Sequence, residues 1–506
     1  MKFVFSVVRI YYRPTTFTPT CLRSFCSSGS KSSSFKGKSR KTTWSPSPSP
    51  TPNPSPAHKA AKELNCSPAP AVTSFPLTEQ QSQALNIVSA GESVFITGSA
   101  GTGKTILLKH VIEILTQIHG SKHVFVTAST GVAACALSGM TLHSFAGIGL
   151  GTADRETLLL TAASKKDTYR RWRRAKALVI DEVSMVDADL FDNLEYIARG
   201  IRANHKNRVW GGIQLIVCGD FFQLPPVSLT TNGSSKSNKE FAFEAECWNA
   251  SFDQHIELTQ IFRQSDTQLI NLLHGIRRGF NDRKHLQLLN TRLVESEPDP
   301  FVIRLFPMKQ DLKRVNDERL RSLGQEIYTY TALDVGRQPW KSQLNLGVAL
   351  DKLELCLGAR VMLLKNFDPS CGLVNGATGK IRGFKKYQVT DISDSGLLPI
   401  VEFDSGQEMV ISPDRWDVTQ GKTVFATRRQ LPLIPAWALS IHKCQGMTLD
   451  SLHTDLSRAF GCGMVYVALS RVRSLDGLHL SGFDSSKIKA HPKVLEFYQN
   501  LFGCQS

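Results

Sequence analysis

Short apolar runs alternate with stretches of helical periodicity over most of the chain beyond residue 75. Residues 93–97, 177–180 and 213–218 are dominated by apolar side chains, which is typical of strands buried on both faces of a parallel sheet. The first run is followed at residues 106–118 by apolar positions at helical spacing. This alternation predicts an α/β fold with a doubly covered parallel sheet.

The pattern changes at residues 381–428. Short β-like runs at 397–403 and 408–411 lie there between Gly, Asp, Ser and Pro turns. We therefore expect a small all-β insertion, folded as a barrel, within the α/β chain.

The first 74 residues carry no such periodicity. Residues 45–56 read SPSPSPTPNPSP, which cannot form a helix or a central strand, so residues 43–74 are expected to be a disordered linker. Residues 1–42 contain Arg, Lys and Ser but no acidic residue, a composition typical of a mitochondrial transit peptide. An ordinary basic tail is the alternative, and a nuclear location stays open.

Charge and hydrophobicity narrow the class of protein. The 506 residues are 41% hydrophobic, and no apolar run approaches the roughly 20 residues of a membrane-spanning helix. We therefore expect no membrane partner. The net charge is +16, but eleven of the 60 Lys and Arg residues precede Glu63, so 49 face 44 acidic residues beyond it. This mildly basic remainder is compatible with nucleic acid without being diagnostic of it.

The loop after the first predicted strand reads GSAGTGKT (98–105). Glycines let backbone N–H groups turn inward around phosphate oxygens, and the following helix N-terminus adds its dipole. In this strand–loop–helix context Lys104 is expected to reach the β- and γ-phosphates of a nucleotide. Thr105 is expected to place its hydroxyl on Mg²⁺.

Two further predicted strands end in polar residues. Asp181 and Glu182 follow residues 177–180, where an acidic pair can hold Mg²⁺ through Asp181 and deprotonate the attacking water through Glu182. The third strand ends in GDFFQLPP (219–226). Gln223 is the candidate γ-phosphate sensor there, because its amide both donates and accepts; a plain turn is the alternative.

Two arginines lie in otherwise mostly apolar segments, Arg263 in LTQIFRQ (258–264) and Arg471 in YVALSRVR (466–473). An arginine supplied by a second lobe can stabilise transition-state charge and couple hydrolysis to closure of the lobes. A surface ion pair is the simpler interpretation of either arginine alone.

These motifs occur in order with several others: LTEQQ (77–81), TASTGVAA (127–134), TLHSFAG (141–147), IDEVSM (180–185), GLVNG (372–376) and SIHKCQGMTLD (440–450). Over about residues 75–499 the chain resembles the PIF (petite integration frequency) family of superfamily-one DNA helicases. Residues 190–215 match the stretch that separates this family from its RecD-like relatives. Cys444 and Trp210 depart from it, standing where the family usually has serine and phenylalanine.

The resemblance implies a role for each matching residue. Gln81 would read the adenine of ATP, with Gln80 as the alternative register. The nucleotide site would comprise Gly98, Ser99, Ala100, Gly101, Thr102, Gly103, Lys104 and Thr105. Catalysis would rest on Lys104, Asp181, Glu182, Gln223, Arg263 and Arg471, with Mg²⁺ on Thr105 and Asp181. Single-stranded DNA would follow Thr127, Ser129, Thr130, Gly131, His143, Ser144, Phe145, Asn375, His442, Lys443 and Thr448.

Two of these surfaces have alternative interpretations. Phe145 and His143 can stack on bases, or the phenylalanine can pack in the core beneath the loop. The basic run at residues 170–174 can contact DNA, although a solvated helix end is favoured because the run immediately precedes the predicted strand at 177–180.

The predicted architecture is two RecA-like lobes. The first spans 75–256 with a wedge insertion near 149–170. The second spans 257–380 and 429–499, is interrupted by the barrel at 381–428, and is followed by a tail at 500–506. The resemblance implies a 5′-to-3′ DNA helicase and DNA-stimulated ATPase in genome maintenance, acting as a monomer on single-stranded, forked or 5′-tailed DNA. An ATP-gated single-strand translocase without strand separation is the alternative. A G-quadruplex preference and a dimer on DNA stay open.

Overall fold

The computed structural model describes residues 77–503, except for 150, 152, 227–238, 281, 295–301, 338–340, 342–343, 345–348, 366, 369–370, 372, 374–375, 387–395 and 421–422. The chain divides into two units, 1–63 and 64–506, and the first lies wholly outside the described residues. The predicted transit peptide and linker therefore lie outside them too. Within the described part of the chain, no helix has the length and apolar character needed to cross a bilayer.

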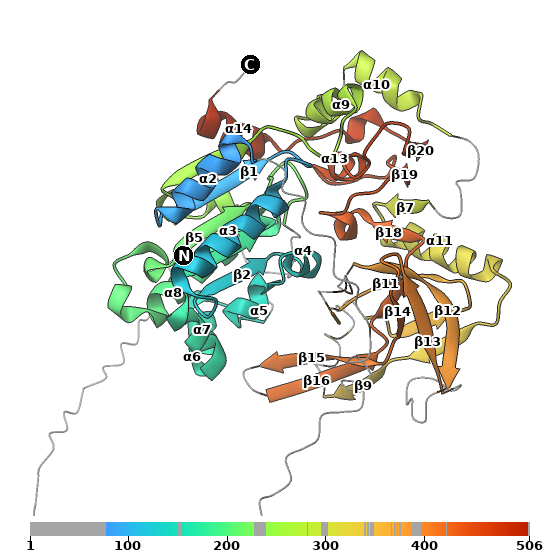
Figure 1. Ribbon diagram of the computed structural model, residues 1–506, viewed down its shortest axis with the longest axis horizontal. Helices are drawn as coiled ribbons and strands as arrows, with labels where there is room; N and C mark the ends of the chain where they lie inside the picture. The colour runs from blue at the N-terminus through green and yellow to red at the C-terminus, as the bar shows by residue number, and fades with distance from the viewer. Residues whose placement is uncertain are drawn as a thin grey trace, which may run out of the picture. The chain divides into compact units, whose positions relative to one another are not determined.

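The first lobe is a six-stranded parallel sheet (Figure 1). Its strands are β1 (Val94–Gly98), β2 (Val124–Ala128), β3 (Met140–Thr141), β4 (Ala177–Asp181), β5 (Gln214–Cys218) and β6 (Gln254–Leu258), in the order β3-β2-β4-β5-β1-β6. The carboxyl ends of β1, β4 and β5, which carry the predicted nucleotide motifs, therefore meet at one edge of the sheet.

Both faces of this sheet are covered, because successive strand residues point to opposite sides. Val94 and Ile96 pack with the helices α2 (Glu79–Ser89) and α3 (Lys104–His119). Phe95, between them, packs on the other face with α8 (Ala188–Ile201) and a cluster of aromatic rings. Thr78 begins α2 with a reciprocal capping box to Gln81, which fixes that glutamine beside the phosphate loop.

The second lobe contains a four-stranded parallel sheet in the order β18-β7-β19-β20. Its strands are β7 (Ile303–Phe306), β18 (Ala438–Ser440), β19 (Leu452–Asp455) and β20 (Leu478–Gly482). Its helices are α9 (Thr267–Arg277), α10 (Arg283–Asn290), α11 (Lys309–Ser322) and α13 (Met464–Leu469). The predicted fold of two parallel α/β lobes is confirmed.

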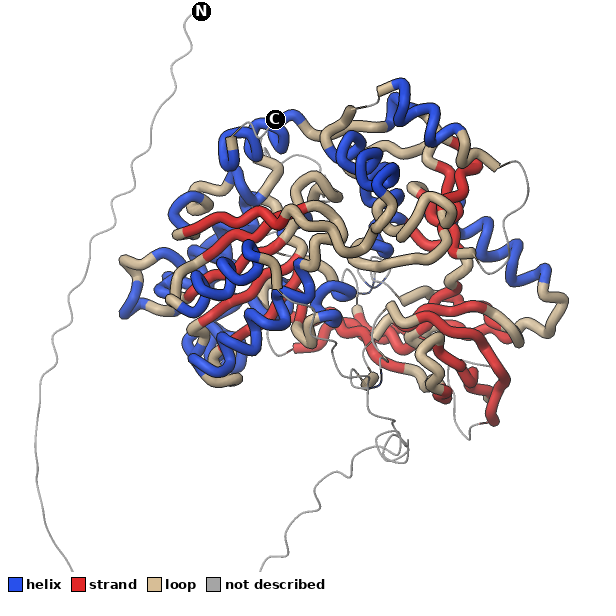
Figure 2. Tube along the Cα trace, turned by 45° about the horizontal axis from the view of Figure 1, so that its top comes forward, coloured by secondary structure: helices blue, strands red, loops and turns tan. Residues whose placement is uncertain are grey.

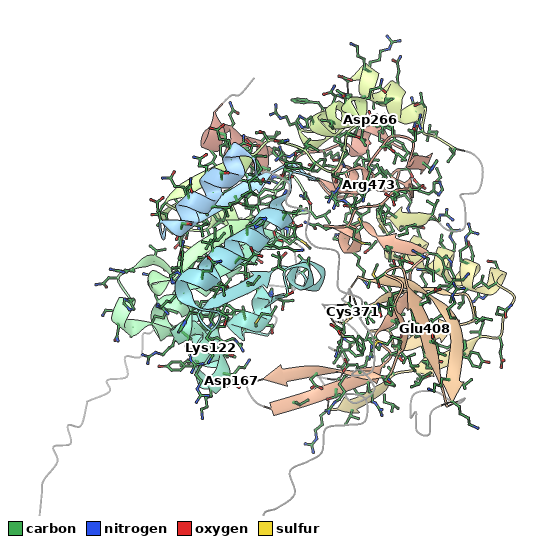
Figure 3. All side chains as sticks on the ribbon, viewed as in Figure 1. Lys122, Asp167, Asp266, Cys371, Glu408 and Arg473 are labelled. Carbon is green, nitrogen blue, oxygen red and sulfur yellow. The ribbon has the colours of Figure 1, made fainter. Side chains whose placement is uncertain are left out.

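The β insertion is longer than the predicted 381–428. It comprises β8 (Tyr328–Thr331), β9 (Leu333–Gly336), β10 (Lys352–Leu355), β11 (Arg360–Leu363), β12 (Thr378–Lys386), β13 (Leu397–Phe403), β14 (Glu408–Val410), β15 (Asp414–Gln420), β16 (Thr423–Gln430) and β17 (Leu433–Pro435). These strands form sheets of five, three and two strands among the described residues, and β11 and β17 pair directly in the largest. We call residues 328–435 the β module; Figure 2 shows its strands in red, and Cys371 and Glu408 mark it in Figure 3.

Two further boundaries differ from the prediction. The wedge contains α6 (Arg155–Ser164) and α7 (Lys166–Arg174), so it extends beyond residue 170. The last helix, α14 (Pro492–Phe502), was expected in the second lobe but packs on the first. Val494 and Tyr498 are buried in the same cluster as Phe95, and Lys493 pairs with Glu244.

The imidazole of His453 is buried in the second sheet. His453 on β19 is 2% exposed, and neither ring nitrogen has a hydrogen-bond partner among the described residues. Arg304 on β7 and His479 on β20 lie opposite it in register. Burial, Arg304 and His479 lower the pKa of His453 to about 4, although Asp455 acts in the opposite direction.

This histidine predicts acid sensitivity. Because its folded pKa lies below the ordinary 6.5, the unfolded chain binds a proton first, and stability is lost as the pH falls from about 6.5 towards 4. We expect His453→Leu to flatten the fall of the thermal unfolding midpoint across this range, recovering about 1–3 kcal/mol at the acid end. The exposed His205 provides the control, since His205→Leu should leave the slope unchanged. An unaltered slope in His453→Leu would contradict the assignment.

Candidate nucleotide site and nucleic-acid interface

The phosphate loop, residues 98–105, connects β1 to the N-terminus of α3. Gly101 has a φ of +89°, and a Cβ there would lie 2.8 Å from the Cβ of Arg263. A larger residue would therefore be strained in this backbone conformation and would clash with Arg263. The amide of Phe262 also donates to the carbonyl of Gly101, at 2.8 Å. The segment that carries Arg263 is thus packed directly on the loop.

Lys104 folds back on the loop. Its Nζ donates to the carbonyls of Gly98, at 2.8 Å, and Ser99, at 3.0 Å. These two residues were predicted to line the nucleotide site, but the cleft is lined from Ala100 to Thr105 instead. Gly98 and Ser99 instead contribute carbonyls that bind the ammonium group of Lys104.

Two adjacent carboxylates lie across from the loop at the end of β4. Asp181 is buried, and Glu182 follows with a φ of +52°, a left-handed conformation that is strained for glutamate. Burial and the neighbouring Glu182 raise the pKa of Asp181 to about 7. Together with the exposed hydroxyl of Thr105 in the same cleft, this pair suits a divalent cation.

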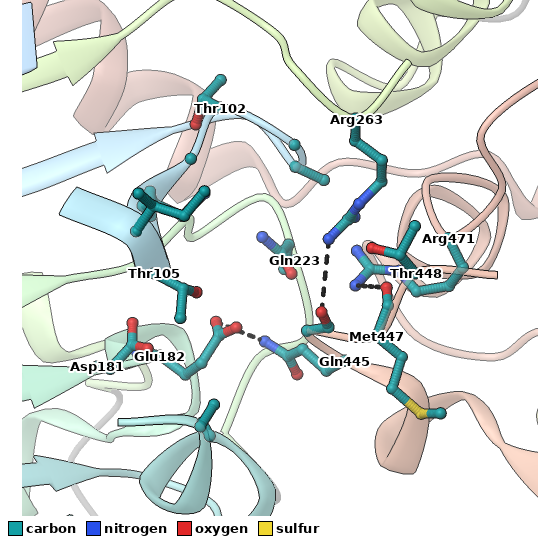
Figure 4. Close-up of a pocket in the computed structure, with 18 of the residues that line it drawn as sticks. Thr102, Thr105, Asp181, Glu182, Gln223, Arg263, Gln445, Met447, Thr448 and Arg471 are labelled. Carbon is teal, nitrogen blue, oxygen red and sulfur yellow. Dashed lines mark hydrogen bonds between the residues drawn. The ribbon is translucent and has the colours of Figure 1, made fainter. Parts of the chain in front are cut away.

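The opposite wall of the cleft is positive. The cleft has a volume of about 620 Å³, and Gln223, Arg263 and Arg471 all line it (Figure 4). Arg263 donates to the carbonyl of Ser470 at 3.0 Å, and Arg471 to that of Met447 at 3.3 Å. Burial and the nearby Arg471 lower the pKa of Arg263. The structure therefore brings the predicted catalytic residues of both lobes into one cleft.

The structure also distinguishes Gln81 from Gln80 as the glutamine that lies next to the phosphate loop. Gln81 accepts from the amide of Thr78 at 3.0 Å, which leaves its Nε2 beside the loop, 3.1 Å from where a Cβ on Gly103 would lie. Gln80 instead donates to Thr259, at 2.9 Å. Gln81 is the one positioned at the phosphate loop.

Phe262 and Gln445 are among the cleft residues that the sequence did not predict. Phe262 is 45% exposed although it is aromatic, and its ring lies beside Gly103 and lines the cleft. Gln445 donates to Glu182 from the other lobe, at 2.9 Å. Phe262 precedes a predicted catalytic arginine, but nothing in the sequence distinguishes an exposed ring there from a core one.

Two predicted DNA contacts are wrong because their side chains are buried. The hydroxyl of Thr127 donates to the carbonyl of Val179, at 2.7 Å, inside the sheet. The ring of Phe145 is fully buried, with ring centroids 5.2 Å from Phe125 and 4.6 Å from Trp172. Phe145 is a core residue and cannot stack on a base.

The remaining first-lobe candidates cluster after β2 and β3. Ser129, Thr130 and Gly131 lead into α4 (Gly131–Ala136), and His143 and Ser144 lie on α5 (Leu142–Ala146). Ser144 is exposed and His143 half-buried, and burial lowers the pKa of His143. This surface stays a predicted DNA contact.

In the second lobe, His442 and Lys443 lie on a short turn of 3-10 helix, Ile441–Cys444. Thr448 is exposed and lines the nucleotide cleft, and its DNA contact stays a prediction. Cys444 is buried, and its thiol donates to the carbonyl of Ile441, so it offers no contact to DNA. Asn375 lies outside the described residues.

Within the basic run at residues 170–174 on α7, Arg171 makes contacts that support the fold. Arg171 donates to the carbonyls of Ser144 and Phe145 and so holds the end of α5. Arg202 donates to the carbonyls of Trp172, Arg173 and Ala175 at the end of α7. These contacts fix the helix end. Arg170, Arg173 and Arg174 are exposed, and the choice between a solvated face and a DNA contact for them stays a prediction.

Two parallel α/β lobes, with a phosphate loop in one and arginines supplied by the other, define the class of two-lobed P-loop motor ATPases. Residues 76–282 match the model of the PIF1-like helicase family, and residues 342–384 match that of the DNA helicase Pif1 2B domain. The chain belongs to the PIF1-like helicase family.

Individual relatives agree with this assignment. The chain is 43% identical over 427 residues to the ATP-dependent DNA helicase PIF1 of Xenopus laevis and 42% identical over 428 residues to that of Homo sapiens. Each match covers 84% of this chain but only 64% of the relative. The crystal structure of Pif1 helicase from Candida albicans is 38% identical with a TM-score of 0.77, covering 85% of this chain and all of that one. Bacteroides Pif1 in complex with ADP-AlF3 and single-stranded DNA is 30% identical with a TM-score of 0.68, covering 84% and 97%.

Phe262 predicts how the cleft binds the base of a nucleotide. We expect Phe262→Ala to raise the Kd for ATP about five- to tenfold, because a stacked aromatic face is worth about 1 kcal/mol. Phe262→Trp should bind as tightly as the wild type. Inorganic triphosphate, which has no base, should bind all three equally in competition with a fluorescent ATP analogue. Equal loss of ATP and triphosphate binding would show that the ring acts on the loop rather than on the base.

Proposed function

We propose that the chain is an ATP-dependent DNA helicase that hydrolyses ATP in this cleft and moves 5′ to 3′ along single-stranded DNA. The observation that carries this proposal is the arrangement of Arg263 and Arg471, which come from the second lobe and line the same cleft as Lys104 and Glu182. Hydrolysis would then depend on how the lobes approach each other, which is what a motor requires.

The residues divide the chemistry as follows. The loop from Ala100 to Thr105, which includes Lys104, binds the phosphates. Glu182 takes a proton from the attacking water. Gln223 contacts the γ-phosphate, while Arg263 and Arg471 stabilise the charge that develops on it. Thr105 and Asp181 would hold Mg²⁺, which neutralises charge on the phosphates when it is bound.

DNA is the proposed partner for two reasons. The loops at 129–131 and 143–144 and the turn at 442–443 offer hydroxyls, amides and cationic groups that bind phosphates without reading sequence. A solved Pif1 from Bacteroides is described bound to single-stranded DNA, and another solved relative is described in terms of DNA unwinding at forked double-stranded DNA by two coordinating Pif1 helicases. We propose a monomer as the active form on single strands, with forked and 5′-tailed duplexes as substrates.

The test compares the full chain with Lys104→Ala and Glu182→Gln on 5′-tailed, 3′-tailed and blunt duplexes. We expect strong stimulation of ATP hydrolysis by single-stranded DNA, and unwinding of the 5′-tailed duplex alone. Both variants should lose at least about 10²-fold in hydrolysis rate. Glu182→Gln should still bind ATP, whereas Lys104→Ala should not.

Other outcomes of this assay would indicate a different function or chemistry. Stimulation without unwinding of either tailed duplex would favour a translocase that does not separate strands. Normal unwinding by either variant would contradict the proposed chemistry. A 5′-tailed G-quadruplex, added as a further substrate, measures whether the motor resolves folded DNA.

We further propose that the protein serves genome maintenance in the mitochondrion, through replication, recombination or repair of its DNA. The support is the acid-free basic composition of residues 1–42. A fusion of residues 1–70 to a fluorescent protein should enter mitochondria, and replacing Arg9, Arg13 and Arg23 by Glu should keep it in the cytosol. A wild-type fusion that stays cytosolic or becomes nuclear would refute the proposal.

A further inference from the structure

One side chain of the second lobe reaches across the cleft to the predicted general base. Gln445 Nε2 donates to Glu182 Oε2, at 2.9 Å, and Gln445 is 6% exposed (Figure 4). The other amide atom, Oε1, is buried and has no hydrogen-bond partner among the described residues. Burying an amide oxygen without such a partner costs stability, and a role of this amide beside Glu182 accounts for that cost.

The backbone carbonyl and the side-chain carboxylate of Glu182 are each hydrogen bonded to a segment that carries predicted DNA contacts. Its backbone is in the strained left-handed region, and its carbonyl accepts from the hydroxyl of Ser129, at 2.7 Å. Its carboxylate accepts from Gln445, which directly follows the turn with His442 and Lys443. The position of the carboxylate therefore depends on one loop from each lobe.

The same second-lobe segment also holds both arginines. The carbonyl of Gly446 accepts from Arg263, at 3.5 Å, and that of Met447 from Arg471, at 3.3 Å. Residues 445–447 thus contact the general base and the two charge-stabilising groups through three consecutive residues. A displacement of this segment would move all three groups together.

We propose that Gln445 is the positioning residue for Glu182 and makes ATP hydrolysis dependent on DNA. DNA on His442 and Lys443 fixes the turn, the turn fixes the amide, and the amide directs the carboxylate. This inference rests on the proposed DNA-stimulated ATPase activity, and it adds a residue to which no role was assigned from the sequence.

The experiment uses the full chain and measures kcat and KM for ATP with saturating oligo-dT, the rate without DNA, and the Kd for oligo-dT. We expect Gln445→Ala to lower the DNA-stimulated kcat about 10- to 100-fold, because a misdirected base costs about that much. The KM and the Kd for DNA should stay within about twofold of the wild type, and the DNA-free rate should fall less than the stimulated kcat. Gln445→Glu, the same shape with a like charge facing Glu182, should lose as much.

A matched variant separates positioning from stability. Gln430 is a buried glutamine of the β module whose Nε2 donates to the carbonyls of Tyr330 and Leu350. Gln430→Ala should lower the thermal midpoint while leaving the stimulated kcat intact. Removing Gln445 in a Glu182→Asp background, where the shortened carboxylate no longer reaches the amide, should cost less than about twofold further.

The possible failures are distinguishable. If DNA does not stimulate the wild type, the proposed function falls and this inference falls with it. If DNA stimulates the wild type and Gln445→Ala equally, only the inference is overturned. If Gln445→Ala loses kcat and DNA affinity together, or loses as much in the Glu182→Asp background, Gln445 supports the lobe interface instead and the positioning role is wrong.

Discussion

The buried ion pair between Asp220 and Arg277 joins the two lobes directly behind the nucleotide cleft. Asp220 follows β5 in the first lobe, and Arg277 ends α9 in the second; their closest atoms, Oδ1 and Nη2, are 2.9 Å apart. Burial by itself would lower the pKa of Arg277, but Asp220 reverses this and raises it. Loss of either partner would leave a buried charge uncompensated, at a cost of about 3–5 kcal/mol. The relative placement of the catalytic groups depends on this pair.

Around the pair, hydroxyls from distant parts of the chain support the phosphate loop from behind. Tyr466 in the second lobe accepts from the amide of Ala100, at 2.8 Å. Tyr498 on α14 hydrogen bonds to Thr97, at 2.7 Å, and accepts from the amide of Phe221. The last helix thus belongs to the first lobe because it supplies polar partners for the ends of two central strands. A loop supported in this way can present its amides to phosphates without rearranging.

The parts of the site that local sequence dictates could be predicted, and those set by long-range packing could not. The phosphate loop, Asp181 and Glu182 follow from a strand, a turn and a helix in immediate succession. Phe145 is aromatic and could therefore stack on a base. Its burial depends on Trp172, which lies 27 positions further along the sequence. The start of the β module was missed because β11 and β17 are three or four residues long and pair across about 70 positions. Gln445 lies within the segment SIHKCQGMTLD (440–450), yet only the fold brings it to Glu182.

The charges in the cleft offer the proposed motor a way to couple its two lobes to a nucleotide. Arg263 and Arg471 donate to neutral carbonyls on residues 446, 447, 467 and 470. A phosphate would offer them charged oxygens, which form stronger hydrogen bonds. A ligand shifts a conformational equilibrium only through its difference in affinity for the two states, and this exchange of partners supplies such a difference. In the proposed motor, the segment that holds Gln445 would lose two contacts when the arginines turn from Gly446 and Met447 to a phosphate. The contact of the second lobe with Glu182, and that of the adjoining turn with DNA, would then change as each nucleotide binds and leaves.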